Sequence, residues 1–307
     1  MKNEPVAPGT VLVGVDGSQH ANRALTWAAE QAVLEGRPLT VVHAAHEGDV
    51  RTAAWVGAMP DVLDSAREVV REAVTLVEAK HPGLEVVGVP RLGDPRHVLV
   101  ELSETSHLVV VGSRGRGTFA SLLLGSVSAS VAKHARCPVV VTRPGGHGVV
   151  KDGVVVGADG TPESMPVIEF AFRQASLRRL PLTVMHTSFD VAAALALADG
   201  APTTDGADDL RLLLSESVAG LSEKFPDVHV TLELGYGLVD QGLTTSGRPR
   251  DLVVVGRHPV HTLSKLLAGS ISTSVLERSD TTVAVVPEAE TTSDHHIDPG
   301  ATAPAPY

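Results

Sequence analysis

The chain has 307 residues, about twice the length of an average domain, and 43% of them are hydrophobic, which predicts two globular domains that can each bury a core. The formal net charge of −11 argues against broad electrostatic binding to nucleic acid or to an anionic membrane, and no apolar run approaches the roughly 18 residues that span a bilayer. The single cysteine, Cys137, rules out an internal disulfide, and the N-terminus does not read as a secretory signal, so we expect a cytoplasmic protein.

In the first half, short β-branched runs alternate with segments of helical periodicity. Runs typical of buried strands cover 11–15, 39–44, 84–89, 108–112 and 139–142, and helices are expected at 20–36, 61–80, from Asp94-Pro95 onward, and at 126–135. This alternation predicts a doubly wound parallel sheet of five strands with helices on both faces.

The second half repeats the first. VLVGVD at 11–16 returns as VVVGAD at 154–159, an offset of 143, and LVVVG at 108–112 returns at 252–256, an offset of 144. The repeat predicts tandem domains at 8–144 and 151–287, followed by a disordered tail at 288–307 that lacks apolar periodicity. The connections 45–60 and 188–209 are the segments in which the copies differ most.

A glycine-rich loop follows the fourth strand of the first copy. Glycines at the end of a strand let backbone N–H groups approach a ligand, and a helix start adds donors and the positive end of a dipole, which suits phosphate. Asp16, at the end of the first strand, is expected at the same edge of the sheet. The P-loop signature is absent, and the loop follows the fourth strand, which excludes a dinucleotide fingerprint.

The spacing of this loop is more specific than its composition. Gly112, Gly115 and Gly125-Ser126 form the pattern G-2x-G-9x-G-S, which, with VGVDGS at 13–18 and LLLGSVS at 122–128, resembles the nucleotide motif of the universal stress protein family over nearly the whole ordered chain. The resemblance implies two tandem domains of the Rossmann-like, adenine-nucleotide alpha-hydrolase-like α/β class. It also implies ATP with Mg²⁺, and pairing of the closing strands 139–142 and 283–286 between domains.

Carried over to this sequence, the motif implies two sets of ATP-binding residues. In the first domain they are Gly14, Asp16 (also a possible Mg²⁺ ligand), Ala44 against the adenine, Gly112, Ser113, Arg114, Gly115, Arg116, Gly117, Gly125, Ser126, Val127 and Ser128. In the second they are Gly157, Asp159, Thr187, Gly256, Arg257, Gly269, Ser270, Ile271 and Ser272.

The second copy departs from the motif at one position. Pro259 stands where the first copy has Gly115, and proline has no N–H and cannot take a positive φ. We therefore expect the second site to be weaker, altered or empty.

Several of the candidate residues also have a simpler, structural interpretation. The two aspartates can cap the helices that follow them, His43 and His186 are expected to be structural, and Arg114 and Arg116 can be solvated. No general base is evident beside Asp16, so efficient ATP hydrolysis is not expected.

The expected function is nucleotide-dependent stress signalling through an unidentified protein partner, as an internal pseudo-dimer or a homo-oligomer. A nucleotide-independent interaction module and a slow ATPase remain the alternatives.

Overall fold

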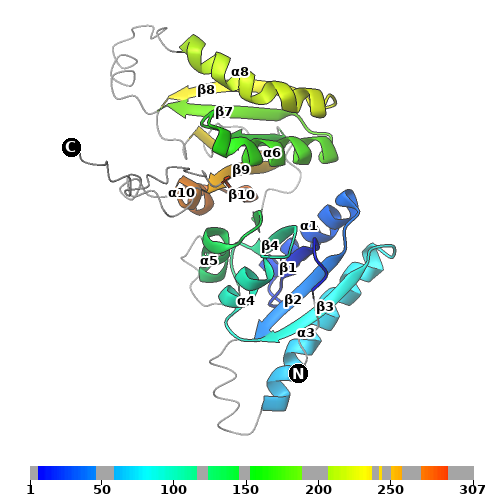
Figure 1. The fold of residues 1–307 in the computed structure, drawn as a ribbon. Coiled ribbons are helices and arrows are strands. Elements are labelled where there is room, and N and C mark those ends of the chain that lie inside the picture. The colour runs from blue at the N-terminus through cyan, green and yellow to red at the C-terminus, as the bar shows by residue number, and fades with distance from the viewer. Residues whose placement is uncertain are drawn as a thin grey trace, which may run out of the picture.

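The computed structural model describes residues 6–45, 59–115, 124–144, 153–188, 207–236, 242–243, 250–257 and 271–289. Its first unit alternates strands and helices in the expected order (Figure 1). The elements are β1 (Val11–Gly14), α1 (Gln19–Glu35), β2 (Leu39–Ala45), α3 (Met59–Lys80), β3 (Val86–Leu92), α4 (Pro95–Leu102), β4 (Leu108–Gly112), α5 (Ser126–His134) and β5 (Val139–Thr142).

The second unit repeats this order. Its elements are β6 (Val154–Gly157), a short 3-10 helix (Pro162–Ser164), α6 (Met165–Arg178), β7 (Leu182–Ser188), α8 (Ala207–Lys224), β8 (Val230–Tyr236), β9 (Leu252–Arg257), α10 (Ile271–Arg278) and β10 (Val283–Pro287).

All ten strands belong to one sheet, in the order β3-β2-β1-β4-β5-β10-β9-β6-β7-β8. Within each unit the strands are parallel, with β1 between β2 and β4 and β6 between β7 and β9. The closing strands β5 and β10 pair antiparallel, Val140 opposite Ala284. This pairing, called the seam below, relates the two units by a pseudo-twofold arrangement and covers two strand edges that would otherwise be exposed.

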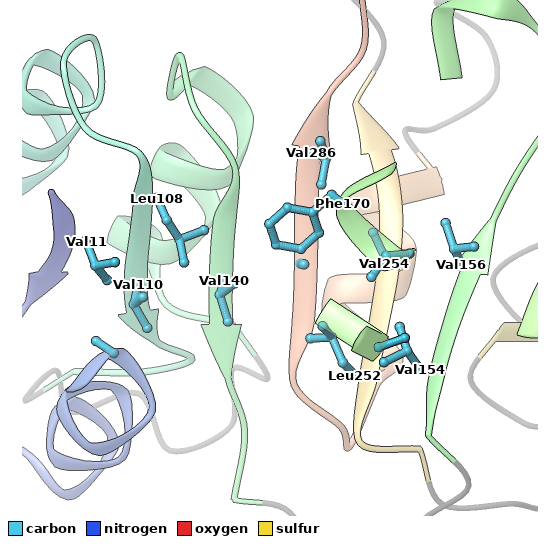
Figure 2. Close-up of a cluster of buried hydrophobic side chains, with 14 of the residues drawn as sticks. Val11, Leu108, Val110, Val140, Val154, Val156, Phe170, Leu252, Val254 and Val286 are labelled. Atoms are coloured by element: carbon cyan, nitrogen blue, oxygen red, sulfur yellow. The ribbon is translucent and has the colours of Figure 1, made fainter. Parts of the chain in front are cut away.

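Each face of the sheet carries a hydrophobic core that continues across the seam. Helices α1, α3, α6 and α8 cover one face, and α4, α5 and α10 cover the other (Figure 1). Successive residues of a strand point to opposite faces, so Val140 joins the first core while Val139 and Val141 join the second. Figure 2 shows residues of this first core on both sides of the seam, Val140 and Leu108 in the first unit and Val286 and Val254 in the second. The α/β fold with parallel sheets and helices on both faces is confirmed.

Local sequence signals set several element ends. Ser18 caps α1 by accepting a hydrogen bond from the N–H of Ala21 (3.1 Å), and α1 stops at Gly36, whose φ of +61° is one that glycine adopts readily. Asp94 caps α4 as expected, with Pro95 in the first turn. The expected strand 84–89 instead covers Val86–Leu92, because Leu84 is held in the turn that follows α3, where its N–H donates to the carbonyl of His81.

A second set of contacts joins the units on the face covered by α1 and α6. Arg178, at the end of α6, donates from Nη2 to Oε1 of the fully buried Gln31 (2.6 Å), and its guanidinium lies 4.7 Å from the ring centre of Trp27. Gln31 in turn donates to Glu35, whose other oxygen lies 2.7 Å from Nε2 of His107. Among the residues that the structure describes, no helix is long and apolar enough to cross a membrane.

Candidate functional site

The residues of the first motif gather at the carboxyl ends of β1 and β4. Gly112 ends β4 against the first turn of α1, where a Cβ would lie 2.7 Å from both the carbonyl carbon and the oxygen of His20. Gly14 ends β1, and a Cβ there would lie 3.0 Å from Leu99. These two glycines let α1 and α4 pack close to the strand ends. In α/β proteins the ligand crevice lies at this edge of the sheet, and the word crevice below refers to this edge of each unit.

Helix α5 begins at this edge of the sheet. Its N-cap is Gly125, which has no side chain to cap the first N–H groups. The start of the helix is held by two hydrogen bonds, from the N–H of Gly125 to the carbonyl of Ser113 (2.8 Å) and from Oγ of Ser128 to the carbonyl of Gly112 (2.6 Å). The N–H groups of Ser126 and Val127 thus belong to a fixed positive helix end that suits an anion.

Asp16 lies against the loop opposite α5. Its Oδ1 accepts a hydrogen bond from the N–H of Ser18 (2.9 Å), so Asp16 forms the turn that leads into α1, while Ser18 is the cap itself. Its Oδ2 is 2.5 Å from the position that a Cβ of Gly115 would take. The absence of a side chain at position 115 is therefore what lets this carboxylate reach the loop.

His20 also faces the loop, although the sequence pattern did not point to it. Its Nδ1 lies 3.3 Å from Oγ of the buried Ser113. Burial lowers the pKa of His20 from its ordinary 6.5, and the positive charges of Arg23, Arg114 and Arg143 lower it further, against the opposing effect of Asp16. The only available signal was its place in the first turn of the helix after the VDGS segment.

The cations around the loop include one that the motif does not contain. Arg143, directly after β5, is buried, and its pKa is lowered by burial and then by Arg114, while Asp280 acts in the opposite direction. The N–H of Ser113 donates to the carbonyl of Thr142 (3.1 Å), which ties the loop to the residue before Arg143. Arg114 and Arg143 both act on the pKa of His20, so two positive charges lie near this loop in a chain of negative net charge.

The end of β2 forms the second wall. Nδ1 of His43 donates to the carbonyl of Val15 (2.7 Å), and in the second unit His186 repeats this contact with Ala158 (2.8 Å). These bonds fix the strand ends and support the structural interpretation of both histidines. Ala44 follows His43 in β2 and pairs with Arg91 of β3.

The crevice of the second unit differs in its polar groups. Gly157 packs against Leu243, and Asp159 accepts hydrogen bonds from both the N–H and the hydroxyl of Thr161. At Gly256, however, a Cβ would lie 2.2 Å from Oε1 of Glu288, so a carboxylate fills the space that the backbone of His20 fills in the first unit.

Arg257, the residue after Gly256, is directed away from the second crevice. Its guanidinium donates to the carbonyls of Lys133 and Ala135 at the end of α5 in the first unit. Nothing in the sequence signalled this contact. Thr187 is the second-to-last residue of β7 and pairs with Gly235, and Ile271 and Ser272 open α10. The remaining expected site residues lie outside the described part of the chain, as do the position that departs from the motif and most of the expected tail: Arg116, Gly117, Gly269, Ser270, Pro259 and 290–307.

The geometry defines an α/β protein in which the order of strands and helices of the first unit returns in the second. The chain belongs to the universal stress protein family: the family model, described as "Universal stress protein family", matches residues 9–143 and 152–287. The tandem arrangement read from the sequence repeat is therefore confirmed.

Curated relatives agree over the whole length. Universal stress protein Rv2005c of Mycobacterium tuberculosis is 34% identical over 295 residues, covering 90% of this chain and 96% of the relative. Rv2623 of the same organism is 32% identical over 293 residues, covering 92% and 97%. A universal stress protein of known structure from Archaeoglobus fulgidus has the same fold, with a TM-score of 0.68, 21% identity, and coverage of 92% of this chain and 97% of that one.

Proposed function

We propose that this universal stress protein binds ATP with Mg²⁺ in the crevice of the first unit and acts as a nucleotide-dependent stress or signalling module. The observation that carries the proposal is the start of α5. A helix whose N-cap is a glycine, so that no side chain of the N-cap residue caps its first N–H groups, is fixed beside the end of β4 by hydrogen bonds from Gly125 and Ser128. Such a helix end is a general binding site for phosphate.

The surrounding residues fit a nucleoside triphosphate. The backbone of Gly112–Gly115, the start of α5 and Arg114 would hold the phosphates, and Ala44 at the end of β2 would meet the adenine, as the family motif implies. Asp16 would otherwise repel an anion, because its carboxylate reaches the loop at Gly115. A hard divalent cation between carboxylate and phosphate removes that conflict, and Mg²⁺ favours such mixed oxygen ligands.

The second unit supports weaker binding or none. Glu288 places a carboxylate beside Gly256, and Arg257, the cation that the motif offers there, contacts α5 of the first unit instead. Both changes make the second crevice less favourable for an anion. Pro259 of the sequence, in place of Gly115, acts in the same direction.

Two measurements test the proposal. Heat denaturation of freshly purified protein, followed by mass spectrometry of the released material, should yield about one ATP per chain. Titration calorimetry with ATP and Mg²⁺ should then show that Gly115→Ala, which forces Asp16 from the loop, weakens binding by about tenfold or more, equal to about 1.4 kcal/mol. Gly83→Ala is the matched control, because a Cβ at Gly83 meets nothing within 4 Å.

The other outcomes separate the alternatives. About two nucleotides per chain would contradict the asymmetry between the units. No released nucleotide and no heat of binding would refute the proposal and favour an interaction module that works without nucleotide. ATP turnover that Asp16→Ala abolishes without loss of binding would favour a slow ATPase.

A further inference from the structure

Two arginines cross the seam in opposite directions, on the face covered by α5 and α10. Arg257, the last residue of β9, donates from Nη1 to the carbonyl of Lys133 and from Nη2 to that of Ala135, the latter at 2.5 Å. Arg143, directly after β5, donates from Nη2 to the carbonyl of Leu276. Each guanidinium therefore contacts a helix of the other unit.

The three carbonyls lie at helix C-termini, where the backbone needs partners. Helix α5 ends at His134, so Lys133 and the C-cap Ala135 lie at its end, and Leu276 is in the last turn of α10. The last four carbonyls of a helix have no partner within the helix, and its C-terminus carries partial negative charge. A guanidinium supplies both the donors and the positive charge that such an end needs.

Both capped helices begin at a copy of the ligand motif. The first N–H groups of α5 form the crevice of the first unit, and α10 opens with Ile271 and Ser272, the equivalents of Val127 and Ser128 in the repeat. We propose that Arg257 and Arg143 are reciprocal interdomain caps, so that each unit stabilises the site helix of the other, and that Arg257 is thereby a positioning residue for the first crevice.

The short length of α5 makes this effect reach the crevice. Its nine residues span about 14 Å, so fraying of the last turn leaves little helix to hold Ser128 on the carbonyl of Gly112. When only part of the population has the competent helix, the apparent affinity for a ligand falls by the same fraction. Removal of Arg257 should therefore loosen α5 and weaken binding at a site in the other unit.

Hydrogen exchange of the ligand-free protein tests the caps directly. Arg257→Ala should speed exchange of the amides in the second half of α5 by about threefold to tenfold, the range expected for loss of a charged helix cap, and leave α10 unchanged. Arg143→Ala should do the reverse and act on α10. Arg136→Ala is the matched control, since it removes an exposed cation from the same end of α5, and it should leave exchange in α5 unchanged.

Titration with ATP and Mg²⁺ tests the consequence, which rests on the proposed function. Arg257→Ala should weaken binding by about threefold to tenfold, Arg257→Lys should recover part of the loss because it retains the charge, and Arg136→Ala should bind like the unmodified protein. The inference is overturned if Arg257→Ala leaves amide exchange in α5 unchanged, whatever its affinity for ATP. It is also overturned if Arg257→Ala speeds amide exchange only in the second unit, which contains Arg257. If the unmodified protein binds no nucleotide, the proposed function fails, while the exchange data still decide whether the caps exist.

Discussion

The close contact between β4 and α1 gives the sharpest test of the first crevice. In Gly112→Ala the added Cβ would lie 2.7 Å from the carbonyl carbon and oxygen of His20. Those atoms belong to the backbone of α1, so no flexible side chain can move aside. Overpacking of a buried position costs about 1–3 kcal/mol, and a unit of this size loses about 2–4 °C of melting temperature per kcal/mol. We therefore expect a loss of roughly 2–12 °C.

Tryptophan fluorescence reports this change selectively. Both tryptophans of the chain, Trp27 and Trp55, lie in the first unit, so their signal during thermal or urea denaturation follows that unit. Gly83→Ala controls for the lost glycine freedom and should stay within about 0.5 kcal/mol of the unmodified protein. A midpoint for Gly112→Ala equal to that of the control would refute the close packing of β4 on α1.

Two further predictions concern the pH dependence of stability and the contact of Arg178 with the first unit. The pKa of His20 is lowered in the folded chain, so the unfolded chain binds the proton first and the stability of the fold should decrease as the pH drops below about 6.5. His20→Gln should remove the part of this decrease that His20 causes, measured as urea midpoints at several pH values. Parallel pH profiles of the variant and the unmodified protein would contradict the prediction. Arg178→Ala removes the partner of Gln31 and the cation above Trp27, which should cost about 1–3 kcal/mol of unfolding free energy and shift the Trp27 emission. The exposed Arg71→Ala is its control and should cost clearly less stability than Arg178→Ala. Equal losses in the two variants would exclude a stabilising contact of Arg178 between the units.

The strands with the most distinctive composition were predictable to the residue. The apolar β-branched runs at 108–112 and 139–142 coincide with β4 and β5, because a strand buried on both faces has few alternatives. The bounds of the edge strand β3 were not predictable to the residue, because the extent of β3 depends on its pairing with β2 as far as Leu92. No local sequence pattern specifies that register. The helix start at Asp94 was predictable because its capping signal is local.

In the candidate site, too, features with a local signal were predictable and contacts between distant residues were not. The position of Asp16 at the same edge as the glycine loop follows from the rule that parallel strands end together, and the structure brings Asp16 to Gly115. The contacts of Arg143 and Arg257 depend on how the two units meet at β5 and β10, and that of Glu288 depends on the pairing of β10 with β9. They are pairs far apart in sequence with no periodic signal, so no reading of the motif alone could place them.

The two crossing arginines show how fusion of the units relaxes a constraint of symmetry. In a dimer of identical subunits each contact occurs twice, because residue i of one subunit meets residue j of the other in both directions. Here the repeat equivalent of Arg257 is Ser113 and that of Arg143 is Pro287, so neither contact has a copy. One chain can therefore keep a glycine-rich crevice in its first unit and give the matching loop position of its second unit to an arginine that supports α5. The asymmetry of the crevices and the caps across the seam are, on this argument, two consequences of the same divergence between the copies.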